Sequence, residues 1–147
     1  MDDTVKILNK LIETSEDGLQ GFKEAADKAT EPQLKQLFSE RAQSCSQSAR
    51  ELQTLVASLG GEAEKSGSVA GAAHRGWVKV KTAVGDNNIA VLEEVERGED
   101  YAKASYTKAL KSELPPQVRQ VVEKQFQGVV ANHDRIRDLR DQYRAAA

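Results

Sequence analysis

Apolar residues recur every three to four positions in four long segments of the chain. The members of the first two stripes include Val5, Leu8, Ile12, Leu19, Phe22, Leu34, Phe38, Cys45, Leu52 and Leu55. A stripe of this width is typical of a helix that packs inside a bundle. The pattern therefore predicts α-helices at residues 3–29, 32–59, 87–112 and 116–143, and no alternating pattern favours a strand.

The second half of the chain repeats the first at an offset of 84 residues. Residues 31–37 lie over residues 115–121 at this offset, and the apolar positions on both sides also match. Each copy bends at a proline, Pro32 or Pro116, because proline suits the first turn of a helix and disfavours helix in the residue before it. The chain is therefore predicted to contain two copies of one helical hairpin, at residues 1–56 and 85–140.

Residues 57–86 connect the two predicted hairpins. Gly60 and Gly61 give a helix-ending signal, and a short helix is predicted through His74 and Trp77, with the tryptophan anchoring it to the bundle. A connection of this length can run along the whole bundle, as it does in ferritin-like folds. We therefore predict an all-α, ferritin-like four-helix bundle that forms a single domain over residues 1–147.

Charge and composition exclude several classes of function. Charged residues make up 30% of the chain, the formal net charge is -2, and both signs are mixed along the sequence. This mixture argues against a nucleic-acid-binding face or a polybasic membrane anchor. No segment approaches the ~20 apolar residues of a membrane span, and the N-terminus lacks an export signal, so we expect a cytoplasmic protein. Cys45 is the only cysteine, which excludes an internal disulfide.

Polar residues interrupt the stripes at the middle of the predicted bundle. The residues at similar distances from the two bends are Ser15, Cys45, Ser48, Glu99, Asn132 and His133. Glu96 and Glu99 occupy two successive core positions of the third helix. Two inward-facing carboxylates are costly to bury unless they are paired, protonated or bound to a cation.

A metal ion is one group that could satisfy these carboxylates. The dinuclear centre of ferritin-like proteins takes a Glu from each of two helices and a Glu-x-x-His pair from each of the other two. Glu99 and His133 fit parts of that pattern, but Ser15 stands at the position equivalent to Glu99, and the second helix has no histidine. A single weak metal site that uses Glu99 and His133 is a further alternative.

A buried polar network is the other arrangement that could satisfy the carboxylates, and we favour it. Arg41 lies at a core position of the second helix, and its planar guanidinium can bind the carboxylate of Glu96 or Glu99 bidentately. Gln125 and Asn132 would then complete the hydrogen bonds. In this arrangement no metal or other cofactor is needed.

Several short motifs also carry a family resemblance. They are the residues 16–18 followed by Phe22, the Leu-Gly-Gly at 59–61, the His-Arg-Gly-Trp at 74–77, the residues 96–100, and His133. With these motifs the chain resembles the bacterial ferritin-like proteins of unknown function that are related to the stress-associated YciE and YciF proteins. The resemblance implies a ferritin-like fold, homodimers and a link to stress. It also implies that any metal ligands would be Asp17, Glu96, Glu99 and His133.

The sequence therefore supports two hypotheses about function. The first is a non-enzymatic helical protein with a structural or partner-binding role in stressed cells. The alternative is an oxidase-like or peroxide-handling protein that binds iron or another divalent metal through an incomplete ligand set. The identity of a protein partner is not encoded in any motif of the chain.

Overall fold

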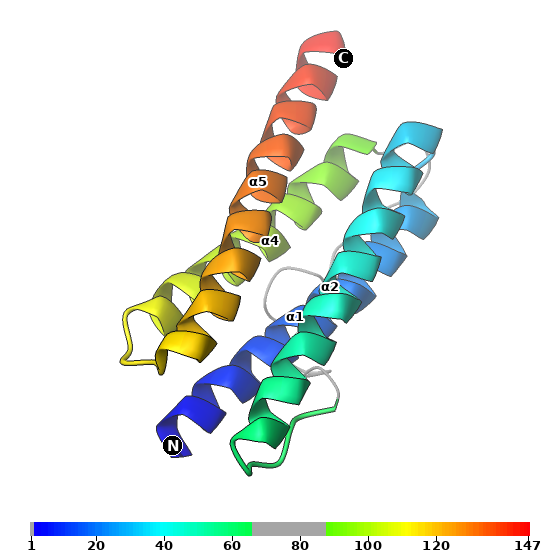
Figure 1. The fold of residues 1–147 in the computed structure, drawn as a ribbon. Helices are drawn as coiled ribbons and strands as arrows, with labels where there is room; N and C mark the ends of the chain where they lie inside the picture. The colour runs from blue at the N-terminus through cyan, green and yellow to red at the C-terminus, as the bar shows by residue number, and fades with distance from the viewer. Residues whose placement is uncertain (1, 66–87) are drawn as a thin grey trace.

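The computed structural model describes residues 2–65 and 88–147. These residues form α1 (Asp2–Lys28), α2 (Pro32–Ser58), α4 (Asn88–Leu110) and α5 (Pro116–Ala146), as Figure 1 shows. The all-α prediction is confirmed, and the predicted helix ends are within three residues of the observed ones. The largest difference is at the C-terminus, where α5 continues to Ala146 because the last residues include alanines, which are strong helix formers.

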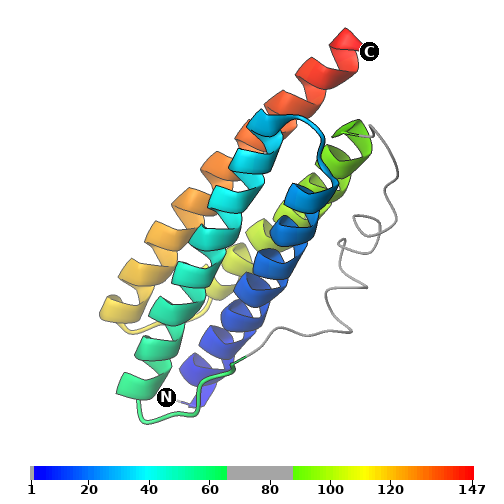
Figure 2. The same cartoon turned by 90° about the vertical axis from the view of Figure 1, so that its right-hand side faces the viewer.

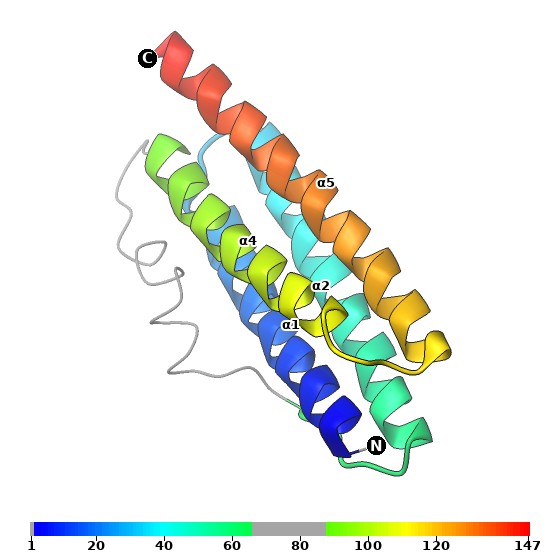
Figure 3. The same cartoon turned by 90° about the vertical axis from the view of Figure 1, so that its left-hand side faces the viewer.

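The helices form two hairpins that pack side by side. α1 packs against α2 and α4 packs against α5, while α1 and α4 make the main contact between the hairpins. Figures 2 and 3 show the resulting bundle from its two sides. The prediction of a four-helix bundle built from two helical hairpins is confirmed.

Proline sets the start of the second helix in each hairpin, as predicted. Glu31 and Pro115, the residues before the two helix starts, have ψ angles of 127° and 145°. These values lie in the extended region that a following proline imposes. Gly60 has a φ of 78°, so a residue that tolerates left-handed backbone ends α2.

Two asparagines fix the points where the chain leaves and rejoins the bundle. At one end Asn9 donates to the Glu62 carbonyl at 3.0 Å and accepts from the Glu64 N–H at 2.9 Å. At the other end Asn88 accepts from the Thr30 N–H at 3.0 Å. The described ends of the connection therefore lie at opposite ends of the bundle. The short helix predicted through His74 and Trp77 lies outside the described residues.

The apolar stripes form two separate clusters, one at each end of the bundle. The first contains Phe22, Ala25, Ala29, Leu34, Leu37, Phe38, Ala42, Val91, Leu92, Val95, Ile136 and Leu139. The second contains Leu8, Leu11, Ile12, Leu52, Val56, Tyr106, Ala109, Val118, Val122 and Val129. Each cluster takes side chains from all four helices, and the polar residues of the predicted middle layer lie between them. None of the four helices described is long and apolar enough to cross a bilayer.

Candidate functional site

A cleft of about 700 Å³ opens into the polar middle of the bundle. All four described helices line it, and we call it the mid-bundle cleft. Its polar lining residues include Ser15, Asp17, Arg41, Cys45, Ser48, Arg50, Glu51, Glu99, Tyr106, Lys124 and Gln125. The two apolar clusters hold the helices together on either side of the cleft. The helices therefore stay packed although a polar cavity lies between them.

Glu99 is the most deeply buried carboxyl group of the cleft. It is 3% exposed, and burial raises the pKa of its carboxyl group, while Arg41 and, more weakly, Asn132 and His133 lower it. Its Oε2 atom has no hydrogen-bond partner. Because burial is the largest of these effects, Glu99 keeps its proton to a higher pH in the folded protein than in the unfolded chain.

Arg41 does not make the bidentate pair that we predicted from the sequence. Of the described ion pairs none includes Arg41, so its guanidinium lies more than 4.0 Å from every described carboxylate oxygen. Instead the guanidinium lies over the ring of Phe22, at 5.8 Å from the ring centroid, in a cation–π contact. Its Nε atom is buried and has no hydrogen-bond partner.

Gln125 is the centre of a buried hydrogen-bond chain that crosses the cleft. It accepts from the Tyr106 hydroxyl at 2.7 Å. It donates to Glu51 Oε1 at 3.0 Å and to the Ser48 carbonyl at 3.3 Å. Gln125 therefore belongs to a polar network, as predicted. Its partners are Tyr106 on α4 and Ser48 and Glu51 on α2, and Arg41 is not among them.

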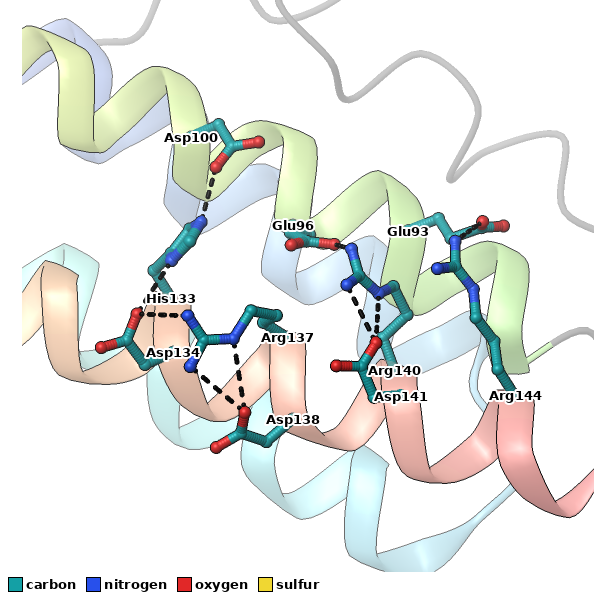
Figure 4. A network of polar contacts seen from close by, with 10 residues as sticks. All are labelled: Glu93, Glu96, Asp100, His133, Asp134, Arg137, Asp138, Arg140, Asp141 and Arg144. Atoms are coloured by element: carbon teal, nitrogen blue, oxygen red, sulfur yellow. Dashed lines mark hydrogen bonds and ion pairs between the residues drawn. The ribbon is translucent and has the colours of Figure 1, made fainter.

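The remaining predicted ligands, Glu96 and His133, pair with side chains between α4 and α5, as Figure 4 shows. Glu96 binds Arg140, which corrects the prediction that Arg41 would reach Glu96. His133 Nε2 lies 2.5 Å from Asp100 Oδ1, and its Nδ1 lies 3.2 Å from Asp134 Oδ1. Both ring nitrogens of His133 are therefore engaged outside the mid-bundle cleft.

Cys45 lies on the α2 wall of the cleft, opposite α1. Burial raises the pKa of its thiol to about 12. A Cβ atom placed on Gly18 would lie 3.0 Å from Cys45 Sγ, so the glycine permits close approach of α1 and α2. The thiol is therefore a packing group and stays protonated at neutral pH.

A family model matches residues 3–112, and its description is a domain of unknown function, DUF2383. The chain belongs to the DUF2383 family. No curated protein matches the chain.

The solved structures supply a likeness in fold. A crystal structure of a two-domain protein from Anabaena variabilis ATCC 29413, with DJ-1/ThiJ/PfpI-like and ferritin-like domains, is similar to the chain with a TM-score of 0.77 and 18% identity. The match covers 97% of the DUF2383 chain and 40% of that protein. This likeness shows the ferritin-like fold.

Among the residues that the structure describes, the predicted ligands of this DUF2383 chain do not come together as a dinuclear metal centre. Asp17 and Glu99, 5% and 3% exposed, both line the mid-bundle cleft, whereas Glu96 and His133 are engaged elsewhere. Within residues 2–65 and 88–147, no three His, Cys, Asp or Glu side chains form a group able to hold a metal ion. Two carboxyl groups beside an arginine are a poor match for a site that normally has several carboxylates and histidines.

Sequence reasoning did not identify three residues that matter for this site. Asp100 pairs with His133, and Arg140 pairs with Glu96. Glu94 is buried, with 6% of its surface exposed. Arg140 follows Ile136 by four residues and so lies on the same face of α5, which is a signal that could have identified it. Asp100 and Glu94 stand outside the apolar stripes, so the periodicity carries no signal for them.

Proposed function

We propose that this DUF2383 chain is a non-enzymatic ferritin-like helix bundle, related to the stress-associated YciE and YciF proteins, in which polar side chains occupy the place of the metal centre. The pairing of Glu96 with Arg140 and of His133 with Asp100 is the observation that carries this proposal. These pairs engage Glu96 and His133, which are two of the four predicted metal ligands. They also link α4 to α5 across the polar layer.

The electrostatics of Glu99 support the same proposal. A buried carboxylate needs a nearby cation or a proton, and burial raises the pKa of Glu99 more than Arg41 lowers it. The protonated carboxyl group is neutral, so it can stay in the bundle without a metal ion. A polar layer between two apolar clusters can also fix the register of the helices, because a shifted helix would bury these groups without partners.

Divalent metal binding is a second candidate function, and one observation favours it. Glu99 Oε2 has no hydrogen-bond partner, and Asp17 lines the same cleft. Carboxylate oxygens are the ligands of hard divalent cations, so this pair would contribute to an iron-dependent or other metal-dependent activity.

Metal analysis separates the two candidates. The protein would be reconstituted with ferrous iron in the absence of air, desalted, and its metal content counted per chain. Glu99→Gln removes the carboxylate with little change of shape, and Glu93→Gln is a control because Glu93 pairs with Arg144 on the exposed surface. We expect no stoichiometric iron in any of the three proteins. One or two iron atoms per chain in the wild type and in Glu93→Gln, but none in Glu99→Gln, would refute the non-metal proposal.

We also propose that the protein acts in the cytoplasm as a homodimer, with neither a membrane nor a nucleic acid as its partner. The mixed charge of a chain with a formal net charge of -2 supports the absence of a nucleic-acid or membrane partner. Light scattering coupled to size-exclusion chromatography would measure the mass. A mass near 16.1 kDa at micromolar concentration would contradict the dimer.

A further inference from the structure

Three cationic side chains line the mid-bundle cleft without an ion-pair partner. They are Arg41 and Arg50 on α2 and Lys124 on α5. Among the residues that the structure describes, no carboxylate oxygen lies within 4.0 Å of these groups. By contrast, the arginines at 97, 119, 137, 140 and 144 each have a carboxylate partner. Among the described residues Arg135 on α5 also lacks a carboxylate partner, so two of the three unpaired arginines line the cleft.

The three cations differ in depth along the cleft. Arg50 and Lys124 are exposed, whereas Arg41 is half-buried. Its Nε–H is shielded from bulk water and has no acceptor. A buried donor without an acceptor costs free energy, so an acceptor that reached Arg41 would relieve that cost.

Two carboxyl groups of the cleft, Glu51 and Glu99, form no described salt bridge with these cations, although the charge of Arg41 lowers the pKa of Glu99. Glu51 accepts a hydrogen bond from Gln125 at 3.0 Å, and the described residues include no salt bridge between Arg41 and Glu99. The side of the cleft near Gly128 is open, since a Cβ atom placed there would meet nothing within 4 Å. An anion therefore has both a charge to bind and a way to reach it.

We propose that the mid-bundle cleft binds a small organic acid, with its carboxylate on Arg41 and with Arg50 and Lys124 attracting it at the mouth. The planar guanidinium of arginine binds a carboxylate through two parallel hydrogen bonds. A volume of about 700 Å³ lies within the range of small-molecule pockets. Ala102 and Val129 offer apolar surface to the body of the acid.

This binding is independent of the metal question, because it depends on the cations of the cleft rather than on a metal ligand set. The full chain, treated with a chelator to remove metals, would be titrated with sodium benzoate and followed by ¹⁵N–¹H NMR. Benzamide has the same shape without the charge, and inorganic phosphate is an anion without an organic body. The variants would be Arg41→Met and Lys124→Gln, with Arg97→Gln as the matched control, because Arg97 is exposed and pairs with Glu94.

We expect benzoate to shift the amide signals of Gly98, Ala102 and Gly128, and Arg41→Met to weaken its binding at least about tenfold. Lys124→Gln, an exposed change that leaves the core intact, is expected to weaken binding by a few-fold, and Arg97→Gln to leave it unchanged. Failure of benzoate to bind at 10 mM, or equal binding by wild type and Arg41→Met, would overturn the proposal. Equal affinity for benzamide would show that charge does not direct binding, and equal affinity for phosphate would show that no organic acid is selected, so either result also overturns it.

Discussion

Replacing Gly18 by alanine tests the close approach of α1 and α2 at the polar layer. A Cβ atom on Gly18 would lie 3.0 Å from Cys45 Sγ and 3.9 Å from Cys45 Cβ. The first distance is too short for ordinary contact, whereas the second is normal. The stability of Gly18→Ala should therefore depend on whether the Cys45 sulfur is present.

The two opposing contributions can be estimated. Alanine stabilises the middle of a helix by up to about 1 kcal/mol relative to glycine. Forcing an extra methyl group into a packed contact costs about 1–3 kcal/mol. In the wild-type background Gly18→Ala is therefore expected to be neutral or to destabilise by up to about 2 kcal/mol. In a Cys45→Ala background, where the sulfur is gone, the same change is expected to stabilise by up to about 1 kcal/mol.

A double-mutant cycle measures this difference directly. Urea unfolding of wild type, Gly18→Ala, Cys45→Ala and the double variant would be followed by circular dichroism at 222 nm. Gly128→Ala is the matched control, since it is also a mid-helix glycine but a Cβ there meets nothing within 4 Å. It should stabilise equally with and without Cys45. A coupling free energy near zero between Gly18→Ala and Cys45→Ala would refute the argument.

Three further predictions concern the polar layer and the clusters beside it. Burial raises the pKa of Glu99 in the folded state above its ordinary value of about 4.5. The folded state therefore binds more protons than the unfolded chain, and the free energy of unfolding falls as pH rises above about 4.5. Glu99→Gln should reduce this fall, and identical pH profiles from urea unfolding would contradict the argument. Phe38→Ala should destabilise by about 3–5 kcal/mol because Phe38 is 0% exposed and its ring packs on Phe22; a loss below about 1 kcal/mol in the same assay would show that the site is not a packed core. Burial raises the pKa of the Cys45 thiol to about 12, so little of the reactive thiolate is present at pH 8. Cys45 should therefore react with a disulfide reagent far more slowly in the folded protein than in urea. Equal rates would contradict the raised pKa.

The helices and their arrangement could be predicted because they depend on local and repeating signals. Pro32 and Pro116 restrict the backbone where they stand, and the repeat at residues 1–56 and 85–140 requires two similar hairpins. The stripes change from apolar to polar residues at the middle of the bundle. This change predicts two apolar clusters with a polar layer between them. The family resemblance agreed with the fold, while the relation to YciE and YciF stays a prediction.

The partners of the polar side chains could not be predicted in the same way. Successive residues on a helix point about 100° apart, so counting from the bend identifies a layer but not the direction of each side chain. His133 was placed level with Glu99, yet it meets Asp100 at 2.5 Å, one residue further along α4. Arg140 reaches Glu96 because α5 packs directly beside α4, whereas α2, which carries Arg41, does not pack closely against α4.

The composition of the two apolar clusters has a consequence for the stability of each hairpin by itself. Both clusters take side chains from α1, α2, α4 and α5, so neither hairpin contains a complete hydrophobic core. A hairpin on its own would expose its whole apolar face to water, and only a second hairpin can cover it. A single hairpin of this kind would therefore be stable only when a second hairpin packs against it.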